Sequence, residues 1–210
     1  MKHFFRNLLI ATVMLGSVGA NAASITLLNV ANSQARHDAY AGFYTLKVDG
    51  QTVLGMCDDF STNSTIGETW TGIVYDYSSL NSGAGKFGPD PTRYSQIGYL
   101  FSLAPAADYS HQASINEAIW KIMTPTAPKL ATLTGDALNY FNSATDGSHN
   151  SFDYTNYMLA IKPQPLNASQ EFLIVPGIVP PSSVPLPSAV WLLLSGVAAM
   201  FGMGRRSGNA

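Results

Sequence analysis

The sequence predicts an α+β fold: a mostly β-strand, sandwich- or barrel-like domain with a central helical segment. Two patterns predict it. Apolar and polar residues alternate in the first half of the chain, as in half-buried strands, and apolar residues then recur at helical spacing between residues 94 and 141. An apolar segment also stands near each end of the 210 residues, so we expect a signal peptide and a C-terminal hydrophobic helix to flank the domain.

The first half of the domain is expected to form strands. Residues 24–30 are a short apolar run, and Tyr44, Leu46 and Val48 alternate with polar residues. Asp49-Gly50 is a hairpin signal, which makes the following run a return strand. The expected strands are residues 24–30, 44–48, 52–57 and 68–77, and a loop rich in Gly and Pro follows at 81–91.

The middle of the domain is expected to be helical. Apolar residues at helical spacing predict a helix over 94–104, which Pro105 ends. A second helix over 115–123 has candidate caps at 108–110 and ends before Pro125, because a residue that precedes proline is disfavoured in the helical conformation. The elements expected after it are a weaker helix over 130–141 and two strands at 154–161 and 170–175.

The N-terminus has the pattern of a secretory signal. Residues 1–22 combine early basic residues, an apolar stretch and a small-residue cleavage box in which Ala20 and Ala22 hold the two key positions. Cleavage would leave Ala23 as the mature N-terminus. We therefore expect export by the Sec machinery.

The C-terminus carries a second apolar segment. Residues 188–204, which include Trp191, hold no charged residue and would form a helix of roughly 26 Å, close to the ~30 Å of a bilayer core. Arg205 and Arg206 follow it, and basic residues beside a span stay on the cytoplasmic side. The Pro-rich residues 178–183 precede the segment as a stiff linker. The alternative is a buried core helix.

The order of these features resembles a known sorting signal. Val184, Pro185, Leu186 and Pro187 stand before the apolar run, and the arginine pair stands after it. This order resembles the PEP-CTERM signal of Gram-negative surface proteins, with Leu186 in place of the usual glutamate. The resemblance covers residues 184–207 and implies processing by an exosortase, a membrane protease-transpeptidase, so that the membrane anchor is transient.

The composition of the expected domain, residues 23–177, excludes some functions. Residues 23–183 hold seven Lys or Arg and thirteen Asp or Glu, a formal charge of −6. An acidic domain lacks the basic footprint that nucleic acid needs. Cys57 is the only cysteine, so no intramolecular disulfide can form. The four histidines show no metal-ligand spacing, and we expect neither a metal nor a cofactor.

Two stretches carry a second resemblance. The segments at 44–50, 56–60 and 67–70, together with the helix segment 115–120, resemble the thioester domains of bacterial surface adhesins. In active members of that family a cysteine thiol condenses with a glutamine side chain, and the resulting thioester acylates amines. The resemblance gives Cys57 the thiol role and places Asn116 at the glutamine position. Gln112, one turn earlier on the helix, is an alternative partner.

Other candidate sites have plainer alternatives. Asp58 and Asp59 with Glu68 offer the oxygen ligands that calcium prefers, but without EF-hand spacing they are better explained as hydrogen-bonded carboxylates. Glu117 and Asp108 would form an acid/base pair only if the fold joined them. The scattered Trp and Tyr residues could form a sugar-stacking face, although such residues more often belong to the core.

These observations favour a structural or adhesive role in an exopolysaccharide-associated surface layer, and no catalytic site. The expected partners are the export machinery, an exosortase and extracellular polysaccharide. Two alternatives remain open. One is a covalent adhesin that acts through Cys57; the other is a carbohydrate-directed surface enzyme.

Overall fold

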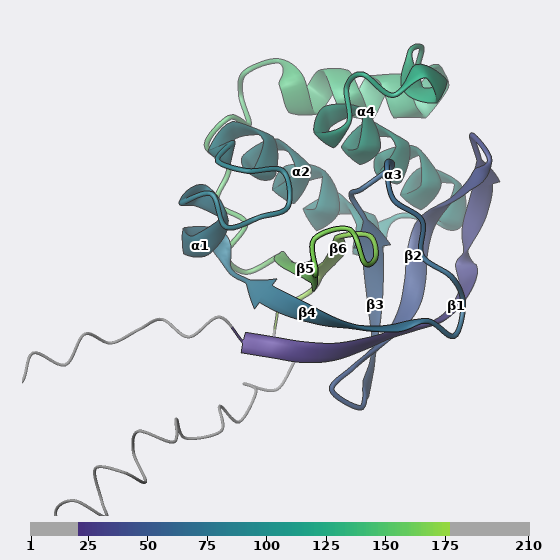
Figure 1. Cartoon of the computed structure of the whole chain (residues 1–210). Coiled ribbons are helices and arrows are strands. Elements are labelled where there is room, and N and C mark those ends of the chain that lie inside the picture. Colours follow the sequence, from purple (N-terminus) through teal and green to yellow (C-terminus); the bar gives the residue numbers. More distant parts are fainter. Residues whose placement is uncertain (1–20, 177–210) are drawn as a thin grey trace, which may run out of the picture.

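Six antiparallel strands form a closed barrel in the computed structural model, which describes residues 21–176 (Figure 1). Their order around the barrel is β1-β2-β3-β6-β5-β4. The strands are β1 (Asn21–Arg36), β2 (Ala39–Val48), β3 (Gln51–Cys57), β4 (Thr69–Tyr75), β5 (Leu159–Gln164) and β6 (Phe172–Ile174). The predicted α+β class is confirmed, and a barrel is the form that it takes.

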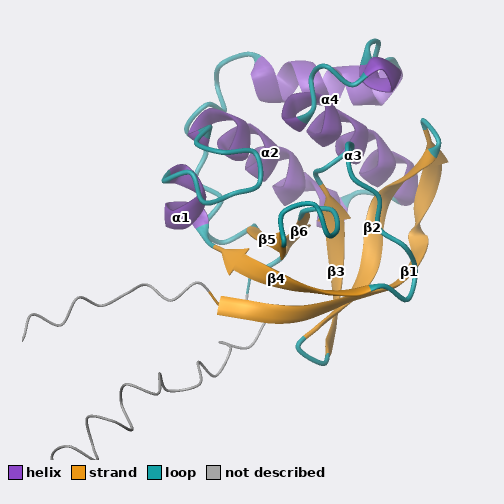
Figure 2. Cartoon of the chain, in the orientation of Figure 1, coloured by secondary structure: helices purple, strands orange, loops and turns teal. Residues whose placement is uncertain are grey.

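The helices gather on one side of the barrel (Figure 2). Helix α3 packs against β1, β2 and β3, and α4 lies on α3 and α2. The α-helices are α1 (Tyr77–Asn81), α2 (Pro91–Leu103), α3 (Tyr109–Met123) and α4 (Gly135–Thr145), with short 3-10 helices at Ala104–Ala106 and Pro128–Leu130. Because β5 and β6 follow all the helices, the helical segment separates the first four strands from the two that complete the barrel.

Two hairpins set the register of the first three strands. Asp49 and Gly50 have φ angles of 47° and 90°, and Val48 pairs with Gln51 across them, so the predicted turn is confirmed. The turn between β1 and β2 was not predicted. It uses His37 and Asp38 at φ angles of 51° and 62°, a conformation that sequence patterns rarely reveal in residues other than glycine. Both strands therefore extend further toward this turn than expected.

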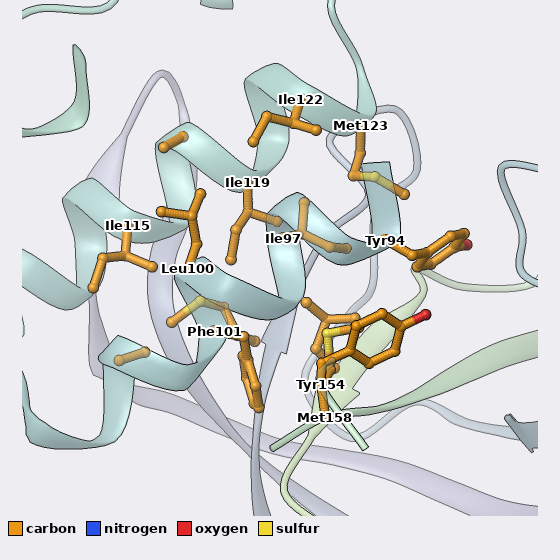
Figure 3. Close-up of a cluster of buried hydrophobic side chains, with 14 of the residues drawn as sticks. Tyr94, Ile97, Leu100, Phe101, Ile115, Ile119, Ile122, Met123, Tyr154 and Met158 are labelled. Atoms are coloured by element: carbon orange, nitrogen blue, oxygen red, sulfur yellow. The ribbon is translucent and has the colours of Figure 1, made fainter. Parts of the chain in front are cut away.

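Buried residues form separate cores on the two sides of the barrel wall. Tyr44, Leu46 and Phe172 face the barrel interior, whereas Phe43 and Leu173 belong to the core beneath the helices. The alternation follows from the pleat of a strand, which turns successive side chains to opposite faces. Figure 3 shows the core beneath the helices, which includes Tyr94, Ile97, Leu100, Phe101, Ile115, Ile119, Ile122, Met123, Tyr154 and Met158.

Aspartates set the starts of three helices. Asp76, Asp90 and Asp108 each accept a hydrogen bond from a backbone N–H in the first turn of α1, α2 and α3. Asp76 thereby ends the predicted strand 68–77 early and begins α1, which was not expected. The predicted helices over 94–104 and 115–123 are confirmed. Helix α2 begins three residues earlier than expected because its cap is Asp90, and α3 begins directly after Asp108, which is one of the predicted caps.

Three further element starts differ from those expected. The helix expected from residue 130 begins at Gly135, because Leu130 belongs to the short helix before it. The strand expected from residue 154 begins at Leu159, because Tyr154 lies in a turn and fills the core. The last strand begins at Phe172, two residues later than expected.

Most of the predicted targeting segments lie outside the described residues. The linker 178–183, the sorting signal 184–207 with its helix 188–204, and Ala20 are among them. Ala22 and Ala23, which flank the predicted cleavage point, lie in β1 opposite Ile73 and Gly72 of β4.

Candidate functional site

Five polar side chains meet inside the protein where β3 ends. Asp58 and Asp59 directly follow the strand, Glu171 precedes β6, Lys86 comes from the loop between α1 and α2, and Tyr94 from α2. The three carboxyl groups are fully buried. We call these five residues the buried acid cluster. Charged groups are rarely buried so deeply unless they are paired.

Glu171 is the centre of one half of the cluster. Its Oε1 accepts a hydrogen bond of 2.8 Å from the Tyr94 hydroxyl, and its Oε2 accepts one of 2.8 Å from the backbone N–H of Lys86. The Asp58 carboxyl group neighbours the same carboxylate, and neither of its oxygens accepts a hydrogen bond from the described residues. Three donors thus converge on Glu171 once Asp58 carries a proton.

Asp58 is the member of this carboxyl pair that holds the proton. Burial, followed by the adjacent charge of Glu171, raises the pKa of Asp58 well above its usual value. Burial also raises the pKa of Glu171, but the donors that surround its carboxylate oppose that effect. A neutral Asp58 that shares its proton with an ionised Glu171 gives one Asp58 oxygen a partner, as adjacent carboxyl groups generally do, whereas no N–H or O–H group of the described residues donates to either Asp58 oxygen.

Asp59 and Lys86 form the other half of the cluster. The Lys86 ammonium contacts Asp59 Oδ2, and it also donates to Thr62 Oγ1 at 2.9 Å and to the Ser169 carbonyl at 3.3 Å. The backbone N–H groups of Ser61 and Thr62 donate to Asp59 Oδ1 at 2.8 and 3.2 Å. Both oxygens and all three ammonium hydrogens therefore have partners.

The Asn116 carboxamide is hydrogen-bonded to the backbone of Cys57. Asn116 Nδ2 donates to the backbone carbonyl of Cys57 at 2.6 Å, and Asn116 Oδ1 accepts from the backbone N–H of Gly42 at 2.9 Å. This carboxamide therefore ties α3 to β2 and β3. Gln112 points elsewhere, because its Nε2 donates to the carbonyl of Ala107 at 2.7 Å.

The Cys57 thiol is fully buried and hydrogen-bonded. It donates to the carbonyl of Asp59 at 3.0 Å, and the N–H of Asp59 points back at the sulfur at 3.3 Å. Burial and the two neighbouring aspartates raise the pKa of Cys57 well above its usual value. The thiolate, which is the nucleophilic form, is thus disfavoured in this fold.

The other sequence candidates are not brought together. Glu68 accepts from the backbone N–H of Thr65 in its own turn, away from the aspartates. Asp108 caps α3 and binds His111, whereas Glu117 lies beside Arg36 and His37. No group of three or more His, Cys, Asp or Glu residues suited to a metal ion occurs within residues 21–176. Trp70 and Trp120, with 7% and 0% of their surface exposed, belong to the core and form no sugar-stacking face.

A surface hollow of about 520 Å³ lies near the cluster. Ser61 and Gln170, which both contact Asp59, are part of its lining, as are Phe60 and the ion pair of Asp38 with Lys129. A second hollow of about 520 Å³ is lined by polar residues that include Glu117 and Asp136. None of the three buried carboxyl groups lines either hollow.

The sequence reasoning missed Lys86, Tyr94 and Glu171. One signal could have found two of the carboxyl positions: an acidic residue stands directly beside an apolar run at Cys57-Asp58 and at Glu171-Phe172. Charges that flank paired strands lie at the same barrel rim. Nothing in the local pattern around Lys86, which lies in a Gly-rich loop, indicates that its side chain turns inward.

Comparisons with protein-family models, with curated proteins and with solved structures find no match to this chain. The helices that the structure describes, of which α3 is the longest at 15 residues, include none with the length and apolar character needed to cross a bilayer.

Proposed function

We propose that the protein is an exported, exosortase-sorted surface or matrix protein with a structural or adhesive role in the exopolysaccharide-associated envelope layer. The proposed destination is supported by the predicted signal peptide, residues 1–22, and by the order of features from Val184 to Arg206. One observation supports the structural role. The Cys57 thiol and the carboxyl groups of Asp59 and Glu171 at the end of β3 are fully buried and hydrogen-bonded, as in a stabilising network rather than in an open catalytic site.

The destination is tested by the C-terminal residue of the protein recovered from the cell exterior. In a host with an exosortase, the exported protein should lack the apolar segment, as measured by intact mass. Pro185→Ala combined with Pro187→Ala should hold the chain in the inner membrane. Pro180→Ala combined with Pro181→Ala, in the linker, is the matched control and should leave processing unchanged. Equal recovery of chains that end at Ala210 from all three would overturn the proposal.

The structural role is tested by sedimentation with exopolysaccharide extracted from the host. We expect the purified protein to sediment with the polysaccharide and to leave its chain length unchanged. Shortening of the polysaccharide that disappears in Glu117→Gln would instead assign the protein to the carbohydrate-directed enzymes.

A covalent adhesin is the second candidate, and the contact between Asn116 and Cys57 favours it. Formation of a thioester would require the Asn116 carboxamide to leave its hydrogen bonds with Gly42 and with the Cys57 carbonyl and to turn toward the sulfur. This candidate predicts a protein that is lighter by one ammonia, gains mass with methylamine and loses that reactivity in Cys57→Ala. A chain without methylamine uptake would exclude it.

A further inference from the structure

The Lys86 side chain is directed at a single carboxyl group inside the protein. The Lys86 side chain is 8% exposed, and the Asp59 side chain is fully buried. An ammonium group has three N–H donors, and two of them are held by Thr62 Oγ1 and the Ser169 carbonyl. The third points at Asp59 Oδ2. Loss of that proton leaves the nitrogen lone pair directed at the Asp59 carboxyl group.

The Asp59 carboxyl group is held in the way that an acyl group is held for attack. Its Oδ1 accepts hydrogen bonds from two backbone N–H groups, those of Ser61 and Thr62. Paired backbone donors of this kind stabilise the negative charge that develops on an acyl oxygen when a nucleophile adds to the carbon. The opposite oxygen, Oδ2, faces the Lys86 nitrogen and is free to leave.

From this geometry we infer that Lys86 and Asp59 condense to form an internal amide bond between Nζ and Cγ. One proton passes from Nζ to Oδ2, and the amine then adds to Cγ. A second Nζ proton passes to Thr62 Oγ1, whose own proton goes to Oδ2, and Oδ2 leaves as water. The ammonium and the carboxylate thus become one amide and one water molecule, and no other reactant is needed.

The product suits its surroundings better than the ion pair does. The amide oxygen keeps both backbone donors, and the remaining amide hydrogen faces the Ser169 carbonyl. Two buried charges disappear, along with the cost of keeping them from water. Holding the two groups in contact also replaces a bimolecular reaction by a unimolecular one, which is worth an effective molarity of ~10⁵ M or more. Ser61 and Gln170 line the adjacent hollow, so the released water has a short path out.

The bond would join the loop between α1 and α2 to the end of β3. Unfolding could then no longer separate these segments. A pulling force on the chain would act through the amide bond and would not extend the residues between Asp59 and Lys86. The inference rests on the geometry of this pair and not on the destination proposed above, so either can fail without the other.

The test is the intact mass of the exported full chain under denaturing, reducing conditions, read against its measured termini. We expect a mass lower by one water molecule. Trypsin should fail to cleave after Lys86, and because no Lys or Arg stands between Lys47 and Lys86, residues 48–93 should be recovered as one looped peptide that is lighter by water. The full mass, with normal cleavage after Lys86, would overturn the inference.

Two variants separate this bond from other losses of water. Dehydration of Asp49-Gly50 or Asp146-Gly147 to a succinimide gives the same mass, but it persists in Lys86→Arg, whereas the amide bond does not. Lys162→Arg is the matched control: Lys162 is also partly buried, yet its ammonium contacts the carbonyl of Ala84 and no carboxylate, so the deficit should remain. A deficit that survives Lys86→Arg would overturn the inference.

Thr62 provides a readout of the reaction itself. Thr62→Val removes the hydroxyl that relays the second proton and should slow bond formation ~10²-fold, a typical loss for acid–base catalysis, while Thr62→Ser should restore the rate. The measurement is the fraction of cross-linked chain against time after synthesis. Equal rates in the Val and Ser variants would overturn the relay through Thr62.

Discussion

Asp58 and Asp108 carry the same side chain, yet the fold shifts the pKa values of their carboxyl groups in opposite directions. Asp108 lies on the surface at the start of α3, where hydrogen bonds from His111 lower the pKa of its carboxyl group. Asp58 lies in the buried acid cluster, where burial and the Glu171 carboxylate raise the pKa of its carboxyl group. An aspartate beside an element boundary can therefore either cap a helix as an anion or bridge strands as a neutral acid, depending on the hydrogen-bond donors within reach.

The largest effect is expected from removal of the centre of the buried acid cluster. Glu171→Ala leaves the Tyr94 hydroxyl, the Lys86 N–H and Asp58 without their acceptor, and should lower the free energy of unfolding by ~3–5 kcal/mol. Urea denaturation measures it. Glu68→Ala, which removes one exposed turn contact, is the control and should cost far less. Equal losses would mean that the cluster is no more important than a surface turn.

A second effect comes from the space around Tyr94. A Cβ added at Gly85 would lie 1.9 Å from the Tyr94 hydroxyl oxygen, so Gly85→Ala must displace that side chain from Glu171. We expect a loss of ~1–3 kcal/mol, as for other overpacked sites. Because Tyr94→Phe already removes the hydrogen bond to Glu171 that the Gly85→Ala clash disrupts, the double variant should lose less than the sum of the two single variants. Strict additivity would show that the two sites do not touch.

The pH dependence of stability should separate the two kinds of aspartate. The folded-state pKa of Asp58 is raised, so its contribution is complete below the unfolded pKa of about 4 and is lost as the pH rises through the folded value. The pKa of Asp108 is lowered, so its contribution is present above about 4 and is lost as the pH falls through the folded value.

Urea denaturation across a pH series measures both contributions. Asp58→Asn should flatten the fall in unfolding free energy toward high pH, and Asp108→Asn should flatten the fall toward low pH. The assigned directions of the two pKa shifts would be wrong if Asp58→Asn altered the fall at low pH and Asp108→Asn altered the fall at high pH.

The smallest effect is expected at a helix cap. Asp76 accepts from the N–H of Ser79 at 2.9 Å, and Asp76→Ala should cost about 1 kcal/mol. Asp76→Asn keeps an acceptor oxygen and should cost much less. A large loss in both variants would show that Asp76 does more than begin α1.

The fold could be predicted where the pattern is local. The alternation of Tyr44, Leu46 and Val48, the Asp49-Gly50 turn and the helical spacing around Ile119 each depend on residues close in sequence. The turn at His37 and Asp38 could not be predicted, because two non-glycine residues take a left-handed conformation there. Barrel closure depends on β1 pairing with β4 and β6 lying between β3 and β5, and periodicity contains no information on such distant pairs.

The candidate site could be predicted only in part. Cys57, Asp58, Asp59 and Asn116 were singled out, and the structure brings them to one end of β3. Lys86 and Glu171 were missed because their significance lies in contacts across 27 and 85 residues, the separations of Lys86 from Asp59 and from Glu171. A sequence shows that a charge is present, but it does not show that the charge is buried.

The position of β6 has a consequence for the order of assembly. This strand fills the gap between β3 and β5, and it is the last element in the described chain. If the N-terminal part of the chain emerges first, one edge of β3 stays unpaired until residues 172–174 have emerged. An unpaired strand edge can pair with other chains. The same strand follows Glu171 directly, so the acceptor for Tyr94 and Asp58 arrives in the same step. The barrel and its polar interior therefore close together, once residues 171–174 are in place, rather than gradually as the earlier strands form.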